Sequence, residues 1–173
     1  MPGVQTARLL FREVVAADYD LWLPFYQDPE STRYWEGLPR EPEAACRQQF
    51  DRIFERYEMG LGGMNALIHK KLHCLVGLCG LLVQEVDGIR ELEVGYSLMP
   101  EFRKMGYATE AARACKAYAF SRNLAPSLIS IIHTANLPSQ RVAINNGMHR
   151  DKTTIYKGNP VHIYRVYAEE INA

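Results

Sequence analysis

A short stretch near the middle of the chain has the residue types of an anion site. In Arg103-x-x-Gly106-x-Ala108, the small residues Gly106 and Ala108 leave the backbone open where a helix would expose its first unpaired N–H groups. The helix dipole and the charges of Arg103 and Lys104 add positive potential at the same place. A pyrophosphate fits such a site, although an ordinary β–α turn has the same pattern.

The stretch lacks the residues that mark the common nucleotide sites. No Lys-Ser/Thr pair follows the glycine, and no GxGxxG precedes an acidic residue at Rossmann spacing. This argues against a P-loop and against a dinucleotide-binding fold.

The flanking residues predict a strand, a turn and a helix. Residues 92–99 are rich in β-branched and aromatic types, and Pro100 ends the ladder because it has no N–H to donate. Small residues then recur at helical spacing through Ala111, Ala112, Cys115 and Ala119. The anion site would therefore lie at the start of a helix that ends near Asn123.

Patterning predicts the remaining elements. Strands are expected at residues 9–14, 65–69, 75–83, 91–99, 128–132, 151–156 and 162–168, with a hairpin at Asp87-Gly88. Helices are expected at 19–23, capped by Asp18 and broken or kinked at Pro24, and at 42–59 and 138–147. This order predicts an α/β (α+β) fold with a mixed sheet and helices on both faces, in a single domain spanning 1–173.

Composition excludes several classes. Twenty basic and twenty acidic residues give zero net charge, so bulk electrostatics supports neither a nucleic-acid nor a membrane partner. No apolar run approaches the roughly 18 residues of a membrane helix, and no signal peptide is recognisable. The four cysteines show no CxxC pairing. We therefore expect a soluble, cytoplasmic protein, a monomer or homodimer, with no metal site.

Several separated motifs together resemble the GCN5-related N-acetyltransferase (GNAT) family, in the branch of the RimJ/RimL ribosomal-protein acetyltransferases. They span roughly residues 6–168 and occur in the family's order. They are Thr6-Ala7-Arg8-Leu9 with Arg12, Asp28-Pro29-Glu30 with Arg33-Tyr34-Trp35, Glu93-Val94-Gly95-Tyr96-Ser97-Leu98 with Pro100, Arg103-x-x-Gly106-x-Ala108 with Thr109-Glu110-Ala111, and Asn136-x-x-Ser139-x-x-Val142-Ala143 with Gly147-Met148. Two departures are Ala108 in place of the commoner glycine and Lys104-Met105 in place of Arg-Gly or Lys-Gly.

The resemblance implies a splayed, mostly antiparallel sheet of about seven strands and acetyl-CoA as co-substrate. The pyrophosphate would lie on the amides of Lys104, Met105, Gly106, Tyr107, Ala108 and Thr109, with Arg103 as either a phosphate-side contact or a solvated charge. The pantetheine would run beside the strand that ends at Leu98 and Met99, whose N–H groups would face the thioester carbonyl. Asn136 would bond the pantetheine or serve as a turn residue.

Two residues are candidates for catalysis. An amine must lose a proton before it attacks a thioester, and Glu93 is the best candidate for the base, directly or through water, although it could be a solvent-facing strand residue. Glu91, on the same strand face, could replace Glu93 or raise its pKa. Ser139 either protonates the departing thiolate or caps a helix, and His133 is either a proton relay or structural.

These features predict an N-acetyltransferase that moves an acetyl group from acetyl-CoA to a primary amine by direct attack in a ternary complex. The amine could be a protein N-terminus or a small molecule such as a polyamine, amino acid or antibiotic. The alternative is a noncatalytic acyl-CoA-binding or regulatory module of the same fold.

Overall fold

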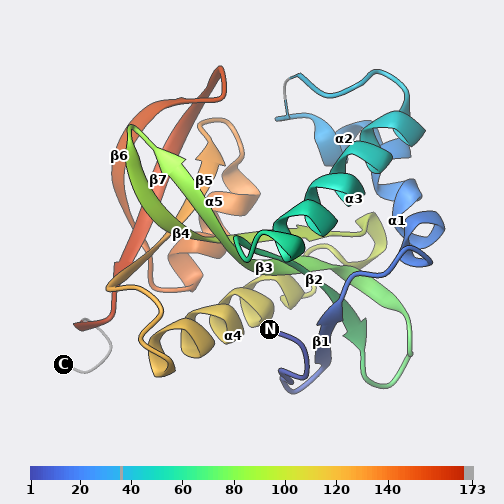
Figure 1. Ribbon diagram of the computed structural model, residues 1–173, viewed down its shortest axis with the longest axis horizontal. Coiled ribbons are helices and arrows are strands. Elements are labelled where there is room, and N and C mark those ends of the chain that lie inside the picture. Colours follow the sequence, from blue (N-terminus) through green and yellow to red (C-terminus); the bar gives the residue numbers. More distant parts are fainter. Residues whose placement is uncertain (36, 170–173) are drawn as a thin grey trace.

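The structure is a computed structural model that describes residues 1–35 and 37–169. The expected domain limits of 1–173 therefore include Glu36 and 170–173, which lie outside the described residues. In chain order the elements are β1 (Leu9–Glu13), α1 (Asp18–Gln27), α2 (Pro29–Thr32), α3 (Pro42–Glu58), β2 (Gly62–His69), β3 (Leu75–Val86), β4 (Ile89–Leu98), the 3-10 turn η1 (Pro100–Phe102), α4 (Tyr107–Ser121), β5 (Ser127–His133), α5 (Leu137–Asn145), β6 (His149–Tyr156) and β7 (Asn159–Tyr167) (Figure 1).

The strands form one mixed sheet in the order β1-β2-β3-β4-β5-β7-β6. Neighbouring strands are antiparallel except β4 and β5, which run parallel and pair only at Glu93 and Ile129 among the described residues. Beyond that pair the two strands diverge. The predicted splayed, mostly antiparallel sheet is thus confirmed, and Glu93 lies where it opens.

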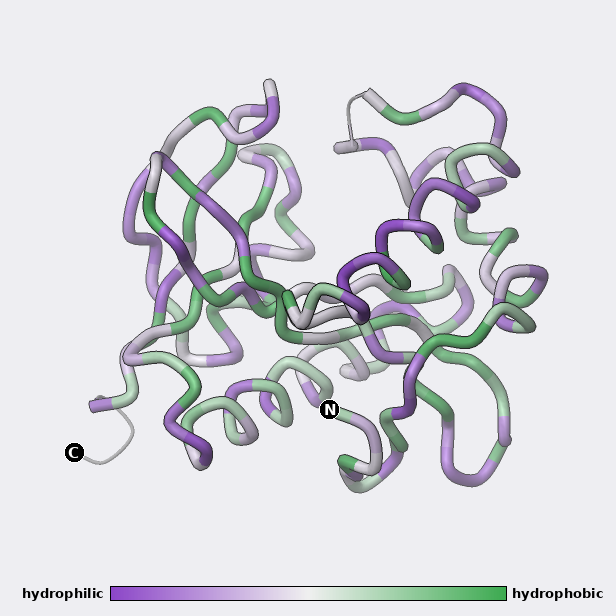
Figure 2. The backbone as a smooth tube through the Cα atoms, in the orientation of Figure 1, coloured by the Kyte–Doolittle hydropathy of each residue, from purple (hydrophilic) through white to green (hydrophobic). Residues whose placement is uncertain are grey.

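Two apolar cores hold helices against opposite faces of the sheet. Small residues of α4, including Ala111, Ala112 and Cys115, let that helix pack closely on one face. On the other face, α1 and α3 bury Trp22, Phe50 and other apolar side chains. Figure 2 shows hydrophobic and hydrophilic residues alternating along α3 and α4, as expected for helices with one buried side.

The first helix differs from expectation at both ends. It begins at Asp18 and runs through Pro24 to Gln27, and its N-cap is Ala17 rather than Asp18. The Asp18 carboxylate instead accepts a hydrogen bond from the Val15 N–H (2.9 Å) and pairs with Arg12 (2.6 Å). Burial of Phe25 and Tyr26 beyond the proline stabilises the last turn and offsets the hydrogen bond that Pro24 cannot make.

Strand and hairpin predictions hold with small shifts of boundary. Asp87 and Gly88 form the turn between β3 and β4, with Val86 opposite Ile89. Both strands extend further toward this turn than expected, because residues 84–86 pair with residues 89–91. Among the described helices none is long and apolar enough to cross a membrane.

Candidate active site

The edge of β4 that faces β5 carries unpaired backbone groups. The Met99 N–H donates to the Val76 carbonyl of β3 (3.0 Å), and backbone groups of successive strand residues point alternately to the two neighbouring strands. Leu98 and Tyr96 therefore point theirs toward β5, as does Val94, whose carbonyl accepts from the Ser130 hydroxyl (2.8 Å). Tyr96 and Leu98 lie beyond the last pair of β4 with β5, so the Tyr96 groups and the Leu98 N–H face the opening, whereas the Leu98 carbonyl accepts from Arg103 (3.3 Å).

This geometry corrects one expectation. The Met99 N–H belongs to the sheet and is not free to face a thioester, because Val76 already accepts its hydrogen bond. The Leu98 N–H keeps the direction that the expected role requires.

The predicted anion site is an open turn before α4. Lys104 (φ 62°) and Gly106 (φ 84°) both have left-handed backbone, and Gly106 is the N-cap residue of α4. Glu110 is the first residue whose N–H bonds back into the helix, to the Gly106 carbonyl (3.0 Å). No described side chain caps the preceding N–H groups. The N–H groups of Tyr107, Ala108 and Thr109 thus have no partner within the helix, and the residues just before them, Lys104, Met105 and Gly106, are exposed.

Arg103 does not extend freely into solvent beside this turn. Its guanidinium pairs with Asp28 at the start of α2 (3.0 Å), donates to the Ser31 hydroxyl, and donates to the Leu98 carbonyl (3.3 Å). These contacts tie α2 to the end of β4. Its phosphate contact remains a prediction, and any such contact would compete with Asp28.

A second hollow lies beside the turn, lined by Gly106 and Thr109 of the expected set together with Arg8 and Arg113. Arg8 pairs with Glu110 (2.6 Å), donates to the Met105 carbonyl (2.9 Å), and stacks its guanidinium 4.1 Å from the Tyr107 ring centroid. Tyr107 is buried, and Ala108 and Thr109 are half-buried. The N-terminal segment therefore holds the turn in place from outside the sheet.

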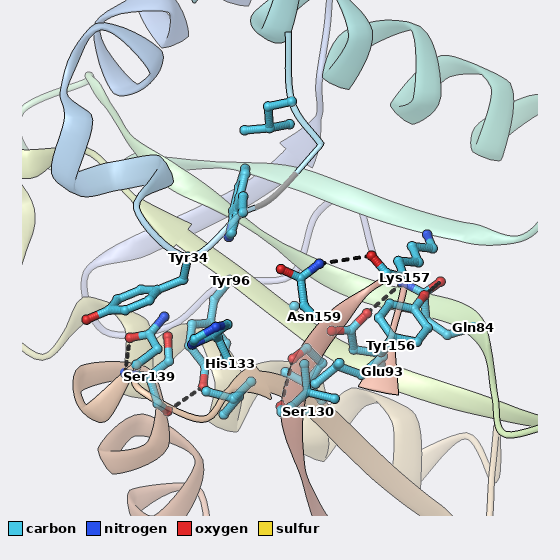
Figure 3. Close-up of a pocket in the computed structure, with 18 of the residues that line it drawn as sticks. Tyr34, Gln84, Glu93, Tyr96, Ser130, His133, Ser139, Tyr156, Lys157 and Asn159 are labelled. Atoms are coloured by element: carbon cyan, nitrogen blue, oxygen red, sulfur yellow. Dashed lines mark hydrogen bonds between the residues drawn. The ribbon is translucent and has the colours of Figure 1, made fainter. Parts of the chain in front are cut away.

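A cavity of about 320 Å³ lies where β4 and β5 diverge (Figure 3). Three of the predicted residues, Glu93, Asn136 and Ser139, line it. The remaining predicted residues, at the end of β4 and in the turn before α4, do not. The expected set therefore separates into a cavity group and a turn group.

Glu93 is held by neutral partners. Gln84 of β3 donates to its carboxylate (2.7 Å), and the Tyr156 hydroxyl donates to the Gln84 carbonyl oxygen (3.0 Å). Burial raises the pKa of Glu93, and the hydrogen bonds from Gln84 and the Ile131 backbone only partly oppose this. A carboxylate with a raised pKa is a better proton acceptor at neutral pH than a solvated one.

Glu91 does not act on Glu93 as expected. Its carboxylate makes two hydrogen bonds with Arg165 of β7 (2.6 and 3.1 Å). The same guanidinium also binds Asp151 (2.8 Å) and Ser127 (2.8 Å). The cause of the raised Glu93 pKa is burial, and Glu91 is already engaged by a cation.

The helix cap that the sequence suggested for Ser139 is provided by Asn136 instead. Asn136 is the N-cap of α5, and its side-chain oxygen accepts from the Ser139 N–H (3.2 Å). The Ser139 carbonyl accepts from the Tyr96 hydroxyl (2.8 Å), and its side chain lines the cavity. The Ser139 hydroxyl is therefore not the cap of α5, and Ser139 is one of the residues that line the cavity.

His133, at the end of β5, stacks on Tyr34 from the segment after α2, with ring centroids 5.2 Å apart. Its Nδ1 accepts from the Ala135 N–H (3.1 Å). Both rings line the cavity (Figure 3). The histidine thus joins the segment after α2 to β5, a structural contact at the cavity wall.

The cysteines lie away from this chemistry. Cys46, Cys79 and Cys115 are buried, and burial raises the pKa of Cys46 to about 11 and that of Cys79 as well. A thiol is a weak nucleophile when its pKa is raised. None of the four cysteines lines the cavity.

Several cavity residues were not expected from the sequence: Arg52, Gln84, Tyr156, Lys157 and Asn159. Gln84 could have been found, because the Asp87-Gly88 turn fixes the hairpin register and places Gln84 diagonally across from Glu93 on one face. The others come from α3, from the adjoining ends of β6 and β7, and from the turn between those strands, and no local sequence signal connects them to Glu93.

Comparison with known proteins gives a consistent result. A family model for the acetyltransferase (GNAT) domain matches residues 8–149. The uncharacterized N-acetyltransferase YnaD of Bacillus subtilis is 27% identical over 176 residues, which cover 98% of this chain and 99% of that protein.

Solved structures share the fold. An acetyltransferase from Agrobacterium tumefaciens superposes with a TM-score of 0.80 at 23% identity, covering 96% of this chain and 95% of that one. RimL, a ribosomal L7/L12 α-N-protein acetyltransferase in complex with coenzyme A, superposes with a TM-score of 0.74 at 13% identity, covering 96% and 98%. The family model, the splayed sheet and the open turn before α4 agree, and the chain belongs to the GNAT family of acetyltransferases.

Proposed function

We propose that the protein transfers an acetyl group from acetyl-CoA to a primary amine by direct attack in a ternary complex. The observation that carries this proposal is the position of Glu93, a half-buried carboxylate with a raised pKa at the point where β4 and β5 separate. Acetyl-CoA supplies the thioester, and the chain supplies the binding surfaces and the proton acceptor.

The backbone of the opening fits acetyl-CoA. The backbone N–H groups in the first turn of α4 have no side-chain cap, so they suit the pyrophosphate. Lys104, Met105 and Gly106, just before this turn, are exposed. Backbone groups of Tyr96 and Leu98 that lie beyond the pairing of β4 with β5 suit the amides of the pantetheine. Asn136 has a side-chain N–H₂ group left for the same ligand after its oxygen caps α5.

Glu93 would take the proton that the amine must lose before it attacks. Gln84 fixes the carboxylate by donating to one oxygen (2.7 Å), which leaves its remaining acceptor capacity for the amine or for a water molecule. The raised pKa makes this carboxylate a stronger proton acceptor than a solvated glutamate.

Ser139 would give a proton to the departing thiolate. Ser139 lines the cavity, and its backbone N–H and carbonyl are fixed by Asn136 and Tyr96. A covalent acetyl-cysteine step is disfavoured because the cysteines lie outside the cavity and burial raises the pKa of Cys46 and Cys79. The four free cysteines also suit the reducing, cytoplasmic compartment that we propose.

An amine-panel assay that follows thiol release from acetyl-CoA tests the proposal. Turnover with at least one primary amine supports it. Binding of CoA without turnover of any amine would favour the alternative, a noncatalytic acyl-CoA-binding module.

Gly106→Asp tests the location of the CoA site. A carboxylate at this position brings bulk and negative charge to the amides that would hold the pyrophosphate, so we expect CoA affinity to fall by about 100-fold or more, roughly 2.7 kcal/mol. Gly88→Asp is the matched control, since Gly88 also has left-handed backbone (φ 76°) and open space around it but lies in the β3–β4 turn. Unchanged CoA affinity of Gly106→Asp in calorimetry would place the anion site elsewhere.

A further inference from the structure

Among the described residues that line the cavity, two side chains are cations, Arg52 and Lys157, and one is a carboxylate, Glu93. Arg52 lies on α3 and Lys157 in the β6–β7 turn. Figure 3 shows Lys157 at the end of the cavity where Glu93, Gln84 and Tyr156 lie. The whole chain has no net charge, so this local excess does not follow from its composition.

These two cations differ from the six that carboxylates hold among the described residues. Among the described residues neither Arg52 nor Lys157 forms an ion pair. Cations that do pair with carboxylates are Arg8, Arg12, Arg33, Arg103, Lys152 and Arg165. Nearby Arg56 is engaged by the carbonyls of Leu61 (2.9 Å) and Val83 (2.5 Å). Arg52 and Lys157 are thus left to meet a negative charge in the cavity.

The two cations act on each other. Burial lowers the pKa of Lys157, and the charges of Arg52 and Arg56 lower it further, whereas Glu93 opposes the shift. The Lys157 ammonium also lies 5.1 Å from the centre of the Tyr156 ring. An anion bound between Arg52 and Lys157 would relieve their mutual repulsion.

From this arrangement we infer that the amine acceptor is a small molecule that also carries a carboxylate, as an amino acid does. The inference rests on the proposed acetyltransferase function and names the substrate class of the same site. Glu93 receives the ammonium end of the acceptor, and Arg52 with Lys157 receives the carboxylate end.

Size and charge both support this class. A cavity of about 320 Å³ is at the lower end of small-molecule sites, so it accommodates a compact acceptor. A polyamine would bring additional positive charge to Arg52 and Lys157, and like charges in a partly buried site repel. The ammonium and the carboxylate of an α-amino acid are bonded to the same carbon, so they are complementary to Glu93 and Lys157, which lie at the same end of the cavity.

The experiment compares matched acceptors with the full-length protein. The panel contains α-amino acids, their α-amides, the corresponding decarboxylated amines, spermidine and short peptides. An α-amide makes the adjacent amine less basic, so the amide has more of the reactive neutral form near pH 8. A preference for the free amino acid therefore cannot come from amine reactivity. We expect kcat/KM to be at least tenfold higher for the free amino acid.

Variants connect the preference to the two cations. Arg52→Gln and Lys157→Gln should each raise KM for carboxylated acceptors about tenfold, and leave KM for acetyl-CoA and for the α-amides unchanged. Arg47→Gln is the matched control, because Arg47 is an exposed arginine of the same helix that does not line the cavity.

The outcomes separate this inference from the proposed function. Three results would overturn the inference and leave the acetyltransferase proposal intact. They are turnover without a preference for carboxylated acceptors, turnover that favours spermidine or peptides, and an unchanged KM for carboxylated acceptors in both variants. Failure of every amine to react overturns the proposed function and the inference together.

Discussion

Two carboxylates on β4 occupy contrasting surroundings although only one residue separates them. Glu91 belongs to a charged cluster, in which Arg165 binds it, Asp151 and Ser127. Glu93 has only neutral hydrogen-bond partners among the described residues: Gln84 binds it and Tyr156 binds Gln84, while the charges of Arg56 and Lys157 act on it through space. Both side chains point to the same face of the sheet.

This difference between Glu91 and Glu93 shows that the hydrogen-bond partners of a carboxylate decide whether its role is structural or chemical. The Glu91 side chain is 12% exposed, and a fixed cation compensates its charge. Glu93 has a neutral hydrogen-bond partner, and burial raises its pKa. The same residue type on one strand face thus stabilises the sheet at position 91 and remains able to accept a proton at position 93.

The largest expected effect is on activity at position 93. Glu93→Gln keeps the hydrogen bond from Gln84 but removes the proton acceptor, so kcat/KM should fall by about 100-fold, roughly 2.7 kcal/mol of transition-state stabilisation. Steady-state kinetics with an acceptor found in the amine panel gives the measurement. A loss below about threefold would exclude Glu93 as the base.

The next effect is on stability at position 91. Glu91→Gln removes a carboxylate that Arg165 binds with little solvent access, which should lower the free energy of unfolding by about 2–3 kcal/mol and leave kcat/KM within about threefold. Urea denaturation measures the loss. Asp151→Asn is the control, because Asp151 binds the same guanidinium with 33% of its side chain exposed and should cost less. Equal losses in the two variants would contradict the argument from burial.

A smaller effect concerns the acid limb of the pH–rate profile. Gln84 donates to the Glu93 carboxylate and so lowers its pKa against the larger effect of burial. Gln84→Met removes the donor while keeping the length of the side chain, so the pKa rises further and the acid limb of kcat/KM should move to higher pH. The plateau above the limb should stay within about threefold. An unmoved limb would show that another group titrates there.

The smallest effect is on the pH dependence of stability. A carboxylate whose pKa is raised by folding adds stability below its unfolded pKa, and this stability is lost as pH rises through the folded pKa. Glu93→Gln has no carboxylate to titrate at this position. The Tm of the variant minus the Tm of wild type should therefore increase as pH rises from the unfolded to the folded pKa of Glu93. Thermal melts at a series of pH values test this. A constant difference would show that folding leaves the Glu93 pKa unshifted.

Local sequence was sufficient for the elements and for the turn before α4. The Asp87-Gly88 hairpin fixes the register of β3 and β4, and Pro100 with Gly106 marks the change from strand to helix. These features depend on backbone preferences of adjacent residues, which a sequence displays directly. The prediction that Asp18 is the N-cap of α1 was wrong, because the Asp18 carboxylate instead accepts from the Val15 N–H and pairs with Arg12 of β1.

Only the tertiary structure decided what each side chain of the site can do. Met99 was expected to offer its N–H to a ligand, yet Val76 accepts that bond, and Arg103 pairs with Asp28 of a distant helix. Arg52 and Lys157, over 100 positions apart in the sequence, line one cavity because α3 and the β6–β7 turn both border it. Pairing, burial and charge depend on which distant segments come together, and so the roles of Glu91 and Glu93 could not be separated from the sequence.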